Sequence, residues 1–99
     1  MISDVTIGIR NALAAFVSHA RKAGLDAPVP TAPEWTVRDL VVHQGMVHRW
    51  ATGHVLGKES DPEALKAEGM AAPDPVIWLH DGGLDLIRAL QSASPDLEA

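Results

Sequence analysis

The segment APEWTVRDLVVHQGMVHRWA, residues 32–51, decides the fold of this chain. A proline and the anchor Trp35 precede Thr36, which is a favourable N-cap residue, and Asp39 follows three residues later as the acid of a capping box. Asp39 also lies in the first turn, where the positive end of the helix dipole favours a negative charge. The segment therefore predicts a helix that begins at Val37.

This helix is predicted to run to about Leu56 and to end near Gly57. Its apolar residues recur at spacings of three and four, which is typical of a helix buried along one side. Two polar residues, Gln44 and His48, interrupt the apolar stripe, although a buried polar group without a partner costs about 1–3 kcal/mol. The flank of the stripe carries His43, Trp50 and His54.

Two further helical regions are predicted on either side of it. Apolar periodicity indicates a helix over residues 3–23, and Gly24 is a natural C-terminal stop. Residues 25–35 contain three prolines, which exclude a helix there. A short helix is expected from the cap residue Asp61 to about Glu68.

A last long helix is expected to begin with Asp74 as N-cap and Pro75 in the first helical position. Gly82 and Gly83 each cost about 1 kcal/mol inside a helix, so they either admit a close neighbour or loosen the helix. Residues 92–99 are expected to fray. No alternation of apolar and polar residues is long enough to predict a sheet.

Length and composition predict one all-α domain over residues 1–99, with three long helices and one short helix. The net charge is −5 and there is no basic cluster, which argues against a nucleic-acid partner. The absence of cysteine excludes disulfides and thiolate chemistry. No signal peptide and no apolar run of about 20 residues is present, so we expect a cytoplasmic protein without a membrane partner.

The five histidines do not form a metal motif by spacing. His43 and His48 are five residues apart, which turns them roughly 140° from each other around a helix. His43 and His54 share a face but lie roughly 16 Å apart along the axis. His19 and His80 belong to other helices. From the pattern alone, a single helix histidine such as His43 is more often a core or half-buried residue whose ring contacts a neighbour than a metal ligand. His48 and Arg49 are expected at the surface or along a groove.

Two patterns carry a resemblance to a known family. The first is W-x-V-x-D-L-V-x-H from Trp35 to His43, followed by G-x-V-H-R-W-A from Gly45 to Ala51. The second is DPVIWL at residues 74–79, followed by small residues. Together they resemble the mycothiol-dependent maleylpyruvate isomerase family, whose metal-binding domains are DinB-like four-helix bundles.

The resemblance implies a metal-assisted, thiol-dependent isomerisation. His43 matches the position of the family's first metal ligand, a neutral imidazole on a divalent ion that is usually Zn²⁺. Mycothiol would be the thiol cofactor, and the small-molecule substrate would be a cis-enoyl diacid such as maleylpyruvate. The family's other ligands, a Glu and a His about one turn apart, come from a fourth helix. Because this chain has no E-x-x-x-H motif, the resemblance implies an incomplete DinB-like bundle with a partial metal site.

Three functional readings remain open from the sequence. The chain could be the front part of such a metal domain without a complete active site. It could be a non-catalytic binding or dimerisation module, because three helices of a four-helix bundle leave an apolar groove that a second copy or a partner helix could fill. It could also be a truncated gene product, which an in-frame E-x-x-x-H segment downstream of the codon for Ala99 would reveal.

Overall fold

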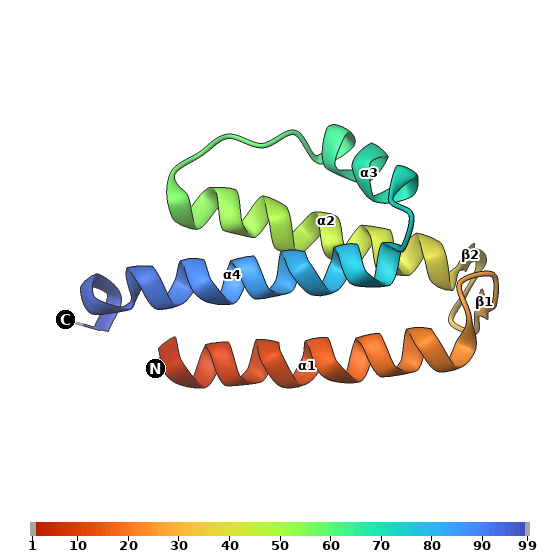
Figure 1. The fold of residues 1–99 in the computed structure, drawn as a ribbon, viewed down its shortest axis with the longest axis horizontal. Helices are drawn as coiled ribbons and strands as arrows, with labels where there is room; N and C mark the ends of the chain where they lie inside the picture. Colours follow the sequence, from red (N-terminus) through yellow and green to blue (C-terminus); the bar gives the residue numbers. More distant parts are fainter. Residues whose placement is uncertain (1, 99) are drawn as a thin grey trace.

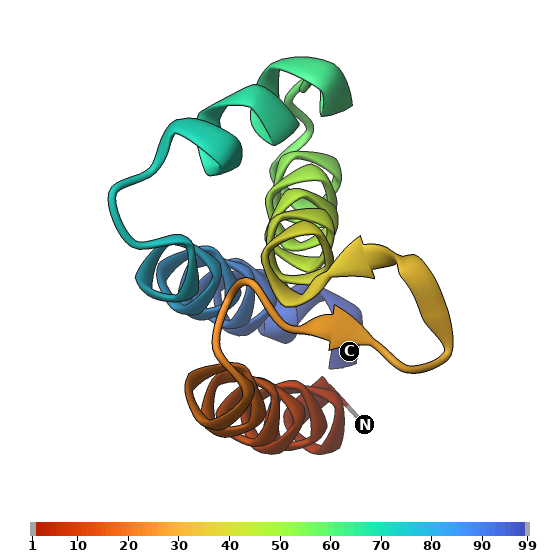
Figure 2. The ribbon, with the colours of Figure 1, turned by 90° about the vertical axis from the view of Figure 1, so that its right-hand side faces the viewer.

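The computed structural model describes residues 2–98 and shows an all-α fold, as predicted. Three long helices run side by side along the molecule, and α4 lies between α1 and α2 (Figure 1). A two-stranded antiparallel hairpin connects α1 to α2 at one end, and α3 lies on the outer side of α2 (Figure 2). The elements are α1 (Ile2–Ala23), β1 (Pro28–Val29), β2 (Ala32–Thr36), α2 (Val37–Leu56), α3 (Pro62–Ala71) and α4 (Pro75–Glu98).

The predicted helix signals at α2 are confirmed. The Thr36 backbone N–H donates to Asp39 Oδ2 at 2.9 Å, and the Asp39 backbone N–H donates to Thr36 Oγ1 at 3.3 Å, which completes the capping box. Gly57 ends the helix with φ 70°, and Gly24 follows α1 with φ 85°. Glycine adopts this left-handed conformation without the steric cost that other residues incur, so both positions stop their helices.

Three expectations need correction. The chain between α1 and α2 forms the short hairpin β1–β2, although it is too irregular in sequence to show strand alternation. The helix α3 continues past Glu68 to Ala71, because Gly69 packs against a neighbouring side chain and so stays within the helix. The backbone of α4 is helical to Glu98, so the fraying expected after Ser92 is not found up to that residue, and Ala99 lies outside the described residues. No glycine of the kind that ends α1 and α2 occurs after Ser92.

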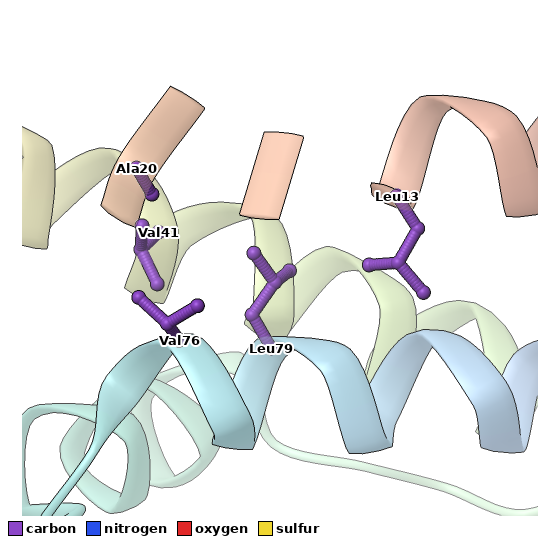
Figure 3. Packing of buried hydrophobic residues seen from close by; sticks show 5 residues of the cluster. All are labelled: Leu13, Ala20, Val41, Val76 and Leu79. Carbon is purple, nitrogen blue, oxygen red and sulfur yellow. The ribbon is translucent and has the colours of Figure 1, made fainter. Parts of the chain in front are cut away.

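The core lies where α1, α2 and α4 meet. Val41 and Leu79 are completely buried at its centre. A Cβ atom at Gly83 would lie 2.6 Å from a Leu13 methyl carbon, so this glycine lets α1 approach α4 closely, which confirms one of the two roles considered for it. Figure 3 shows the buried cluster, which consists of Leu13, Ala20, Val41, Val76 and Leu79.

Candidate functional site

The candidate ligand His43 lies on the exposed face of α2. Its ring meets the Trp35 ring edge-on, with 5.5 Å between the ring centroids. The neighbour that contacts the imidazole is therefore an exposed aromatic ring of the hairpin. A cavity of about 340 Å³ opens beside it between α2, β2 and α3. It is lined by Glu34, Trp35, Asp39, Val42, His43, Lys66 and Met70.

The donor atoms in this cavity do not complete a metal site. Asp39 Oδ2 already accepts from the Thr36 backbone N–H and from the Thr36 hydroxyl, at 2.9 and 3.1 Å. Among the side chains that the structure describes, those of residues 4–92, no group of three or more His, Cys, Asp or Glu residues is arranged to hold a metal ion. The assignment of His43 as a ligand stays a prediction, and the described residues supply no set of partners for it.

The other exposed histidines have surroundings of their own. The His54 ring stacks on Trp50, with 4.6 Å between centroids. His80 Nδ1 lies 3.5 Å from the Asp81 carboxylate. His19 lines an apolar groove between the end of α1 and the hairpin. The structure therefore distributes these side chains over separate parts of the surface instead of gathering them around one point.

His48 was expected at the surface or along a groove, and this expectation is corrected: it is buried between the long helices, with 9% of its surface exposed. Its ring Nε2 lies 3.0 Å from the Gln44 amide nitrogen, one turn earlier on α2, and its Nδ1 has no hydrogen-bond partner among the described residues. Burial lowers the pKa of the His48 imidazole below its ordinary value, and the positive charge of Arg49 lowers it further. The ring is therefore neutral in the folded protein at neutral pH.

Sequence reasoning missed the packing site of the Trp78 side chain where α2, α3 and α4 meet, called the Trp78 slot below. A Cβ atom at Gly45 would lie 2.3 Å from the Trp78 ring, and one at Gly69 would lie 2.6 Å from it, so the indole fits between two glycines of different helices. The Arg49 guanidinium carbon lies 4.4 Å from the centroid of the same ring, and Nη2 donates to the Trp78 carbonyl at 2.8 Å. The indole N–H donates to Glu68 at 2.8 Å. The slot positions α3, which supplies one wall of the His43 cavity.

The neutral state of His48 makes stability depend on pH. His48 takes up a proton near pH 6.5 in the unfolded chain but only at lower pH in the folded chain. Its contribution is therefore fully present above pH 6.5 and falls as the pH drops toward the folded-state pKa. We expect the urea midpoint to be lower at pH 5 than at pH 7.5. The carboxylate of Asp74, whose pKa is lowered mainly by the hydrogen bond from Arg21, loses its contribution only below its ordinary pKa of 3.8.

His48→Leu removes this titration and should abolish most of the difference in urea midpoint between pH 5 and pH 7.5. His54→Leu is the matched control, because it removes an exposed histidine from the same helix and should leave the difference unchanged. An equal midpoint at both pH values in the unsubstituted protein would show that His48 is protonated as readily in the folded chain as in the unfolded one.

Comparison with known proteins identifies a family. A family model described as the mycothiol maleylpyruvate isomerase N-terminal domain matches residues 8–99. No curated protein and no solved structure matches the chain. Among the helices that the structure describes, none is long and apolar enough to cross a membrane.

Proposed function

Because the chain belongs to the mycothiol maleylpyruvate isomerase N-terminal domain family, we propose that it is a helical scaffold contributing one ligand, His43, to a divalent-metal site. The observation that supports this is the place of His43, accessible at the edge of a cavity and held against Trp35. Because the imidazole is exposed and Trp35 restricts its orientation, it can bind a metal without any rearrangement of the core.

The residues present do not fit a complete catalytic metal site. A catalytic zinc site normally uses three protein ligands and one open position. Around His43, the Asp39 carboxylate is engaged by the capping box, Lys66 brings a positive charge to the same cavity, and Glu34 adds one further carboxylate without completing a set of three ligands. We therefore assign further ligands to groups beyond the described residues. In this proposal, the site that is completed by these further ligands binds Zn²⁺ as the metal, mycothiol as the thiol cofactor and maleylpyruvate as the substrate.

A direct test is turnover by the chain alone. With added Zn²⁺ and mycothiol, isomerisation of maleylpyruvate should not exceed the rate without protein, because one imidazole cannot hold the metal in a defined geometry. The ultraviolet spectrum of the diacid follows the conversion. Turnover that is proportional to protein concentration, and that both a chelator and His43→Ala remove, would show that this chain carries a complete site.

A second candidate function is that of a binding module, and an apolar groove favours it. A groove of about 370 Å³ runs between the end of α1, the hairpin and the start of α2. Phe16 and Val37 are only partly buried beside the core there. A second copy of the chain, or a helix of a partner, would cover this surface. The groove is lined by Phe16, His19, Ala20, Ala23, Pro28, Val29, Pro30, Val37 and Leu40.

Self-association tests this candidate. Burying a fully exposed leucine or phenylalanine contributes about 1.5–3 kcal/mol, and the half-buried Phe16 and Leu40 would each gain part of this in a dimer. Sedimentation velocity should show a monomer–dimer equilibrium that Leu40→Gln weakens at least about tenfold. Leu56→Gln is the matched control, because Leu56 is exposed on α2 and does not line the groove. A monomer at every concentration, without binding of a hydrophobic dye, would contradict this candidate.

A further inference from the structure

A second, smaller cavity lies among the three long helices, apart from the His43 cavity. Its volume is about 170 Å³. The exposed residue Ala12 lies on its rim, and the half-buried Ile9 and Phe16 continue that rim along α1, so the cavity reaches the surface between α1 and α2. It is lined by Ile9, Ala12, Leu13, Phe16, Gln44, His48 and Leu79.

The lining of this cavity is apolar except at one place. Of the described residues that form it, Gln44 and His48 are the polar ones, and none is an acid, a lysine or an arginine. An ion entering the cavity would lose its hydration without meeting an opposite charge, which is strongly unfavourable. A neutral and mainly apolar molecule, in contrast, gains from burial against the aliphatic and aromatic side chains.

The polar pair has free hydrogen-bonding capacity. A glutamine amide offers two N–H donors and one carbonyl oxygen, and the contact of Gln44 with His48 uses one of them. Gln44 is half-buried at the cavity wall, so its remaining groups are within reach of a molecule inside. His48 is nine-tenths buried and its Nδ1 has no partner among the described residues. A leucine at either position would pack here without leaving a polar group unpaired.

A costly polar pair in an otherwise apolar wall is a sign of a binding function, since packing alone does not require it. We propose that this cavity binds a small neutral molecule of the size of one aromatic ring with a single hydroxyl group, of which phenol is the simplest. The ring would lie against Leu13, Phe16 and Leu79, and the hydroxyl would bond to Gln44 and His48. An apolar cavity of about 150 Å³ is known to accommodate benzene, so the volume suits one ring.

The test is a titration of the full chain with phenol, followed by the methyl resonances of Ile9, Leu13 and Leu79. Phenol should shift these signals to saturation at millimolar concentration or below. Benzene, which has the ring without the hydroxyl, should bind about tenfold more weakly. Benzoate, which adds a negative charge, should leave the signals unchanged. Absence of a saturable shift with phenol, or equal binding of phenol and benzoate, would overturn the proposal.

Substitutions locate the ligand. Gln44→Leu and His48→Leu should each remove the preference for phenol over benzene while benzene still binds, whereas His54→Leu on the exposed face of α2 should leave the preference unchanged. Ala12→Leu should reduce the binding of both ligands by narrowing the cavity. The methyl spectrum without ligand shows whether each variant is folded, and Gln44→Leu tests the half-buried partner if His48→Leu does not fold. Retention of the full preference by both leucine variants would refute the assignment of the polar pair.

Discussion

Trp78→Ala should destabilise the protein by about 3–5 kcal/mol, which is a large part of the 5–15 kcal/mol typical of a domain. The indole is buried, with 9% of its surface exposed, and its ring contacts the backbones of α2 and α3 at Gly45 and Gly69. Alanine would leave a cavity that two glycines cannot fill. It would also remove the ring beneath Arg49 and the indole donor to Glu68.

Trp50→Ala is the matched control for this prediction. Trp50 is 42% exposed and stacks on the exposed His54, so its removal should cost less than about 1 kcal/mol. Urea denaturation of both variants gives the two free energies, and circular dichroism at 222 nm is the suitable signal because it follows helix content while each substitution changes the tryptophan fluorescence. Equal losses would show that the Trp78 slot does not hold the helices together.

Gly45→Ala should also destabilise the protein, although alanine is a better helix former by about 1 kcal/mol. The new Cβ atom would lie 2.3 Å from a Trp78 ring carbon, closer than any real contact, so the indole or α2 must move. Overpacking of this kind costs about 1–3 kcal/mol and sometimes more. The indole of Trp78 is rigid and also packs closely against Gly69, so it cannot move aside as the end of a flexible aliphatic side chain would.

Gly8→Ala should change the stability of the protein in the opposite direction. Gly8 lies inside α1, and a Cβ atom there would meet nothing within 4 Å, so the substitution should stabilise the protein by up to about 1 kcal/mol. Thermal unfolding should therefore move the midpoint down for Gly45→Ala and up for Gly8→Ala. A rise in both midpoints would mean that α2 and α4 are not packed as closely as the structure indicates.

Helix positions were predictable because their signals are local. The capping pair Thr36 and Asp39, the stops at Gly24 and Gly57 and the N-cap Asp74 each act within a few residues of their own position. Helix type and order therefore follow from short windows of sequence. The hairpin was missed because its strands are too short to show alternation, and their pairing depends on the turn between them.

The site was less predictable because its geometry depends on packing between helices. The prediction of His43 as a ligand comes from the order of residues in α2, but neither its exposure nor its contact with Trp35 can be derived from spacing. The interruption of the apolar stripe by Gln44 and His48 was visible, and it marked the polar wall of the small cavity. The glycines around Trp78 gave no local signal, because Gly45 and Gly69 come together only when α3 folds back over α2.

We propose that the described residues contribute one metal ligand, His43, and no complete metal site. Isothermal titration of the purified protein with Zn²⁺, compared with His43→Ala, decides between this proposal and a complete site in the chain. We predict weak binding without a defined one-to-one stoichiometry, since a single imidazole leaves the ion mostly hydrated. Sub-micromolar one-to-one binding that His43→Ala abolishes would contradict the claim, because it would require other residues of this chain to complete the site.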